Sequence, residues 1–137
     1  MTRVSKKDLD PKHLQKLYTQ LGKMIAHLDQ KKASVFLEEL FGREEKIMIA
    51  KRLAAVVMLI EKNSNYRIAQ LLQMSPSTVE RLRQNYHTGA YEGIEKMLLK
   101  NRQAYEDFWK TLEIVLRAGL PPRNKGRWKS TFEALNK

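Results

Sequence analysis

The chain lacks cysteine, and it lacks any long apolar run. The missing cysteines exclude disulfides, thiol catalysis and thiolate metal sites. The longest apolar run, residues 53–60, is far too short to span a bilayer, and the polar amino terminus has no signal-peptide core. These absences favour a soluble cytoplasmic protein that has no membrane role.

Acidic residues are few relative to basic ones. The sequence holds 26 Lys and Arg against 15 Asp and Glu, a formal net charge of +11. Residues 1–68 hold 14 basic and 8 acidic side chains, and residues 69–137 hold 12 and 7, so the excess is spread along the chain. Such an excess favours a polyanionic partner, most often nucleic acid.

The sequence also lacks the residue patterns of a catalytic or metal site. His13, His27 and His87 have no ligand at metal-site spacing, and no glycine-rich loop follows a strand-like segment. The paired acids at residues 38–39 and 44–45 are typical of ordinary helix surfaces and helix starts. We therefore expect no enzyme activity, no cofactor and no metal.

Helical periodicity is present along most of the chain, and no segment alternates like a strand. Asp10 and Pro11 start a helix whose apolar residues recur to Leu28 at nearly heptad spacing. Further helices are predicted at 34–41, 43–62, 65–87 (two helices), 91–98 and 105–116, with the 43–62 helix central because its apolar band is too wide for one neighbour. The fold class is all-α, a multi-helix bundle, in which Trp109 belongs to the core.

Residues 65–86, NYRIAQLLQMSPSTVERLRQNY, have the pattern of two short helices joined by a three-residue turn. The small Ala69 lets the two helices cross closely. Ser75 and Pro76 suit the cap and first position of the second helix. Apolar side chains on the facing sides are Ile68, Leu72, Val79, Leu82 and Tyr86. This is a helix-turn-helix, predicted at about 65–87.

A helix-turn-helix places the start of its second helix in the major groove of double-stranded DNA. Polar residues opposite the apolar stripe are then the candidate base contacts: Ser77, Thr78, Glu80, Arg81 and Gln84. Arg81 suits guanine, Gln84 suits adenine, and Glu80 can accept from cytosine N4. The plainer interpretation is a solvated helix face.

Phosphate contacts are predicted around the first helix of the motif and the start of the second. The candidates are Lys62, Asn65, Tyr66, Arg67 and Ser75. Arg83 lies closer to the buried side, so we assign it a phosphate or an intramolecular contact and no base.

The carboxyl-terminal tail, residues 120–137, interleaves cations with one aromatic ring. Its candidate nucleic-acid contacts are Arg123, Lys125, Arg127, Trp128 and Lys129. An equally good interpretation has Trp128 packed on the domain with the charges in water.

From about Phe36 to Leu98 the sequence resembles the tryptophan repressor superfamily. The resemblance lies in FLEELFGREEKIMIAKRLAAVVMLIEKNSNYRIAQLLQMSPSTVERL, with its acidic helix start, central helix and helix-turn-helix. It implies an intertwined all-helical homodimer, which accounts for the apolar stripe of residues 14–28. The way in which the second helix of the motif enters the major groove is established for the tryptophan repressor itself.

The resemblance also implies an effector pocket, since two arginines sandwich the indole ring in tryptophan-binding members. Arg52 and Arg81 stand at those positions. Those members have glycine after the second arginine, where Leu82 would fill the ligand space, and a threonine where Gly42 stands. We expect a member that is not gated by tryptophan, which leaves Arg81 available to DNA.

These patterns divide the chain into a helical DNA-binding domain at 1–119 and the basic tail at 120–137. Within the domain we assign dimerisation helices to about 10–62, the helix-turn-helix to about 65–87, and additional helices to about 90–118. The expected function is sequence-specific double-stranded DNA binding by a repressor-like transcription regulator. The alternatives are sequence-tolerant DNA or RNA binding led by the tail, and a helical interaction protein.

Overall fold

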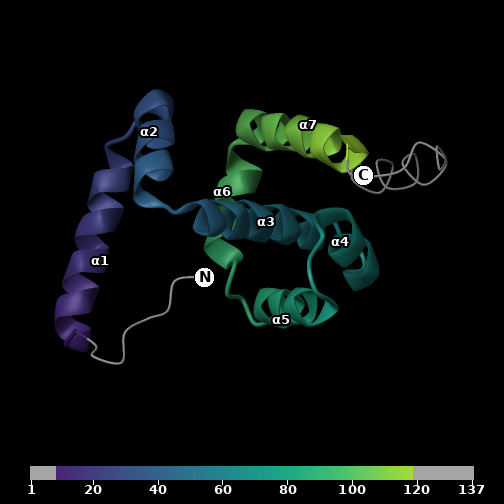
Figure 1. The fold of residues 1–137 in the computed structure, drawn as a ribbon, viewed down its shortest axis with the longest axis horizontal. Coiled ribbons are helices and arrows are strands. Elements are labelled where there is room, and N and C mark those ends of the chain that lie inside the picture. The colour runs from purple at the N-terminus through teal and green to yellow at the C-terminus, as the bar shows by residue number, and fades with distance from the viewer. Residues whose placement is uncertain (1–8, 119–137) are drawn as a thin grey trace. The chain divides into compact units, whose positions relative to one another are not determined.

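A computed structural model describes residues 9–118 of the chain (Figure 1). These residues form seven helices and no strand, which confirms the all-α prediction. The helices are α1 (Pro11–Ala26), α2 (Gln30–Leu40), α3 (Arg43–Ile60), α4 (Asn65–Leu72), α5 (Pro76–His87), α6 (Glu92–Lys100) and α7 (Arg102–Ala118). The predicted tail contacts at residues 123–129 lie outside the described residues.

Helix boundaries follow capping residues that are visible in the sequence. Asp10 accepts a hydrogen bond from the Lys12 amide at 2.9 Å, and Pro11 occupies the first position of α1. Ser75 caps α5 in the same way through the Thr78 amide at 3.2 Å. Gly89 follows α5 with φ +89°, a conformation that a side chain would strain. Local chemistry therefore sets where these helices begin and end.

The start of α2 differs from the prediction. The helix begins at Gln30 and not near residue 34, because Asp29 caps it by accepting from the Lys32 amide at 2.8 Å. Aspartate before a helix is a strong start signal, and Asp29 places the start of α2 before the predicted one. The earlier start adds a turn to α2 and leaves Leu28 in the short link to α1.

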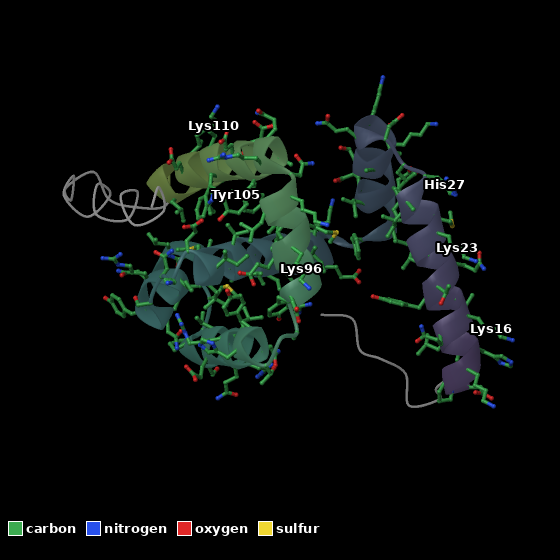
Figure 2. All side chains as sticks on the ribbon, turned by 180° about the vertical axis from the view of Figure 1, so that it is seen from behind. Lys16, Lys23, His27, Lys96, Tyr105 and Lys110 are labelled. Carbon is green, nitrogen blue, oxygen red and sulfur yellow. The ribbon has the colours of Figure 1, made fainter. Side chains whose placement is uncertain are left out.

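The described residues divide into two compact units, residues 9–50 and residues 51–118. In the first unit, residues 9–50 contain no buried residue at all. Leu14 is 54% exposed and Leu17 is 60% exposed on α1. On that helix Lys16, Lys23 and His27 project together from one flank (Figure 2). The unit is amphipathic, yet its apolar side has no core of its own.

The second unit has a continuous core built around the carboxyl-terminal part of α3. Six consecutive α3 residues, 54–59, are buried, so this part of the helix is covered on all sides. In Figure 1, α5 and α7 lie on opposite sides of it. Core residues from the other helices are Ile68, Leu72, Val79, Leu82, Trp109, Leu112 and Leu116. The predictions of a central third helix and of Trp109 as a core residue are both confirmed.

None of the helices in the described ranges is long and apolar enough to cross a membrane.

Candidate nucleic-acid interface

Helices α4 and α5 form the predicted helix-turn-helix, with residues 73–75 as the turn. Gln73 adopts a left-handed conformation, φ 54°, and the Met74 amide donates back to the Ala69 carbonyl at 3.0 Å. Lys51 of α3 donates from Nζ to the Gln73 carbonyl at 3.0 Å. A cation at the carboxyl end of a helix also suits the helix dipole. The turn is therefore stabilised both by its own backbone hydrogen bond and by the side chain of Lys51 on α3.

The facing sides of the motif pack as predicted. Ile68 and Leu72 of α4 are buried with Val79 and Leu82 of α5. Ala69 is half-buried and packs against this core. Burying this flank leaves the opposite flank of α5 for solvent or for a ligand.

The outward flank of α5 carries the predicted base contacts. Ser77, Glu80, Arg81 and Gln84 are exposed, and Thr78 is half-buried. The Thr78 hydroxyl lies 2.7 Å from Ser75 Oγ, so it belongs to the helix cap. The structure thus brings four of the five side chains to one accessible surface.

Two of these side chains are not independent of each other. Glu80 accepts from Asn65 Nδ2 at 2.5 Å through Oε2 and from Gln84 Nε2 at 3.4 Å through Oε1. Asn65 belongs to α4, so the first bond joins the two helices of the motif. Glu80 therefore has both carboxylate oxygens engaged within the protein.

Arg83 completes this arrangement from the half-buried side of α5. Its Nη2 donates to the Asn63 carbonyl at 2.5 Å, and its Nε donates to Asn65 Oδ1. Asn63 is only 2% exposed, and its own Nδ2 donates to the Met58 carbonyl at 3.0 Å. Arg83 thus makes the intramolecular contact that the sequence offered as one of two roles. The partners lie 18 and 20 residues away, and no local pattern in the sequence indicates them.

The predicted phosphate contacts surround the start of α4 and α5. Lys62 and Tyr66 are exposed, and Arg67 is half-buried. The Asn65 amide is occupied at both ends, by Arg83 and by Glu80, and Ser75 Oγ is engaged in capping. Lys62 has a left-handed backbone, φ 63°, in the link between α3 and α4. The contacts of these five residues with phosphate stay a prediction.

Arg52 and Arg81, which the resemblance assigns to an effector pocket, are both exposed. Leu82, which follows Arg81, is 6% exposed and belongs to the core. Its side chain is therefore committed to packing between α5 and the rest of the unit.

Two tyrosines connect the motif and its supporting helices. Tyr86 of α5 donates to Glu95 of α6 at 3.1 Å, and Tyr105 of α7 donates to Glu61 at the end of α3. Burial, followed by the hydrogen bond to a carboxylate, raises the pKa of both phenols, strongly so for Tyr105. Both bonds favour the protonated phenol, so they hold these helices together at neutral pH.

Residues 49–94 match the family model of homeodomain-like domains. The match spans the buried part of α3, both helices of the motif and the start of α6. No curated protein and no solved structure matches this chain. The family match and the geometry of α4 and α5 together make this part of the chain a helix-turn-helix DNA-binding domain.

Proposed function

We propose that the protein is a dimeric, sequence-specific transcription regulator of the tryptophan repressor type that is not gated by tryptophan. The observation that carries the proposal is the exposed polar flank of α5, presented by a helix whose other side is in the core. The net charge of +11 suits the phosphate backbone that such a helix must approach. In this proposal the protein has no enzyme activity, and its cytoplasmic location stays a prediction.

Dimerisation is supported by the first unit. Its helices expose an apolar flank and bury no residue among residues 9–50, which is an uncommon state for a lone chain. A second copy would cover that flank on both chains at once, since a twofold interface uses the same surface twice. Two copies of α5 would then enter successive major grooves about 34 Å apart.

Independence from tryptophan is supported by Leu82. The resemblance places the indole beside the residue that follows Arg81, and here that residue is a core leucine. With no indole between them, Arg81 and Arg52 are not needed as a clamp. Arg81 can then donate two parallel hydrogen bonds to guanine.

Selection of bound fragments from random duplex DNA, at stated salt, tests the proposal. We expect enriched sites with twofold symmetry and half-sites one helical turn apart. A chain without residues 120–137 should keep the half-site preference. Enrichment without symmetry, or binding that disappears with the tail, would favour the sequence-tolerant alternative. Absence of any retained duplex would favour a helical interaction protein.

Two arginine variants separate base reading from phosphate binding. Arg81→Ala should lose discrimination at one base pair per half-site, about 1–3 kcal/mol. Arg67→Ala should weaken binding to all sequences alike and reduce the salt dependence. Equal losses on specific and random duplex for both variants would contradict the proposal.

A further inference from the structure

The four residues Asn65, Glu80, Arg83 and Gln84 form one hydrogen-bonded chain across the motif, here called the recognition network. It starts at the Asn63 carbonyl, passes through Arg83 and Asn65, and reaches Glu80 and then Gln84. Its inner end is anchored by a half-buried guanidinium, and its outer end lies on the exposed flank of α5. The network therefore connects the scaffold of the motif to the surface expected to meet bases.

In each hydrogen bond of the network, the side-chain chemistry fixes which residue donates and which accepts. Arg83 can only donate, so it takes the oxygen end of the Asn65 amide and turns the Asn65 NH₂ toward Glu80. Ionised Glu80 can only accept, so it takes the NH₂ end of the Gln84 amide. The two ends of a glutamine amide have nearly the same shape, and only a fixed neighbour distinguishes them.

This direction matters for reading DNA. With one Nε2 hydrogen given to Glu80, Gln84 retains a second N–H donor and its Oε1 acceptor. Adenine offers N7 as an acceptor and its N6 amino group as a donor in the major groove, which is the complementary pair. Each oxygen of Glu80 already accepts one hydrogen bond within the protein, and these two bonds place its carboxylate beside Asn65 and Gln84.

We propose that Glu80 is a positioning residue that determines specificity through Gln84, selecting adenine, and that Arg83 and Asn65 hold Glu80 in place. The inference rests on the proposed function, because it concerns how the same flank of α5 reads duplex DNA. In this inference Glu80 and Gln84 do not contact two bases independently, because Gln84 alone contacts a base and Glu80 orients it. Glu80 and Gln84 then act on one base pair, and Arg81 acts on another.

The test is site selection from random duplex with the full chain and its variants Glu80→Ala, Gln84→Ala and the double variant. We expect both single variants to reduce the preference at the same A·T base pair by about tenfold. The double variant should lose no more than Gln84→Ala alone, because coupled residues are not additive. Arg81→Ala is the matched control, and it should lose preference at a different base pair.

The outcomes separate this inference from the proposed function. Loss of preference in Glu80→Ala at a base pair that Gln84→Ala leaves intact would overturn the inference, and so would an unchanged preference in Glu80→Ala. In either case the wild-type chain still selects a site, so the proposed function stands. A wild-type chain that enriches no sequence would overturn both.

A separate variant tests the inner half of the recognition network, in which Asn65 joins Arg83 to Glu80. Asn65→Asp places a carboxylate against Glu80, which should displace Glu80 while Arg83 keeps an acceptor. We expect the same base pair to lose preference as in Glu80→Ala, with unchanged helix content by circular dichroism. An unchanged preference would overturn the role of Asn65. Because Glu80 is exposed, Glu80→Ala decides the main question even where an Asn65 or Arg83 variant fails to fold.

Discussion

Residues 9–50 and residues 51–118 have similar amphipathic helices but opposite packing. Residues 51–118 enclose a core in which α3 is covered by α4, α5 and α7, whereas residues 9–50 bury nothing. An apolar stripe in a sequence indicates that this side of the helix is buried against another element. It does not indicate whether that element belongs to the same chain or to a partner. In the second unit the cover is intramolecular. For the first unit we propose a second copy.

The largest effect should come from the core of the second unit. Ile68→Ala removes a fully buried side chain, so the free energy of unfolding should fall by about 2–5 kcal/mol. Urea denaturation of the full chain measures this loss. The control is Ile114→Ala on α7, where the side chain is 70% exposed and the change should stay within about 0.5 kcal/mol. Similar losses in both variants would contradict the assignment of the core.

A smaller effect is expected in the first unit, where the measured quantity is the free energy of self-association. Leu17→Ala should weaken self-association by about 1.5–3 kcal/mol per copy of the chain, the value for burying one leucine side chain. Sedimentation equilibrium over a range of protein concentrations measures it. Lys16→Ala, on the flank of α1 that carries Lys23, is the matched control and should leave association nearly unchanged. A wild-type chain that stays monomeric at every concentration would contradict the proposal that a second copy covers the apolar flank of the first unit.

The smallest effect should appear only in alkali, within the second unit. The pKa of Tyr105 is raised by burial and by its hydrogen bond to Glu61, and the pKa of Tyr86 is raised by burial and Glu95. Their contribution to stability is complete below the unfolded value, about pH 10, and it is lost as the pH rises above that value because the unfolded phenol ionises first.

Tyr105→Phe should therefore flatten the decline of stability above about pH 10. Urea denaturation at pH 8 and at several alkaline values measures the slope. Tyr86→Phe should flatten it less, since its phenol has the smaller shift. An unchanged slope in Tyr105→Phe would show that the Glu61 contact does not stabilise the fold.

Much of the fold could be predicted because its signals are local. Caps at Asp10 and Ser75, the proline at the start of α5 and the glycine after it lie next to the boundaries they set. Asp29 is also a local signal for the start of α2, which lies at Gln30 and not near residue 34 as predicted. Helical periodicity then placed Ile68, Leu72, Val79 and Leu82 on the buried side before any tertiary contact was known.

The candidate site was less predictable than the fold. Sequence spacing predicts that Glu80 and Gln84 lie on the outward flank of α5, but it does not indicate the hydrogen bond between them. The phosphate contact of Asn65 stays a prediction, and the bonds of its amide to Arg83 and Glu80 have no signal in the sequence. The link from Lys51 to the turn at Gln73 spans 22 residues and was not anticipated. Hydrogen bonds between distant segments depend on how helices cross, which periodicity does not specify.

The helices, their caps, the inward and outward flanks of α5 and the excess of positive charge could all be predicted from the amino-acid sequence alone. Each of these follows from interactions over a few residues or from composition. The packing of the helices was needed to show which outward side chains bind neighbouring residues and which apolar flanks are buried within the same chain. Those properties depend on the packing of helices that are far apart in sequence.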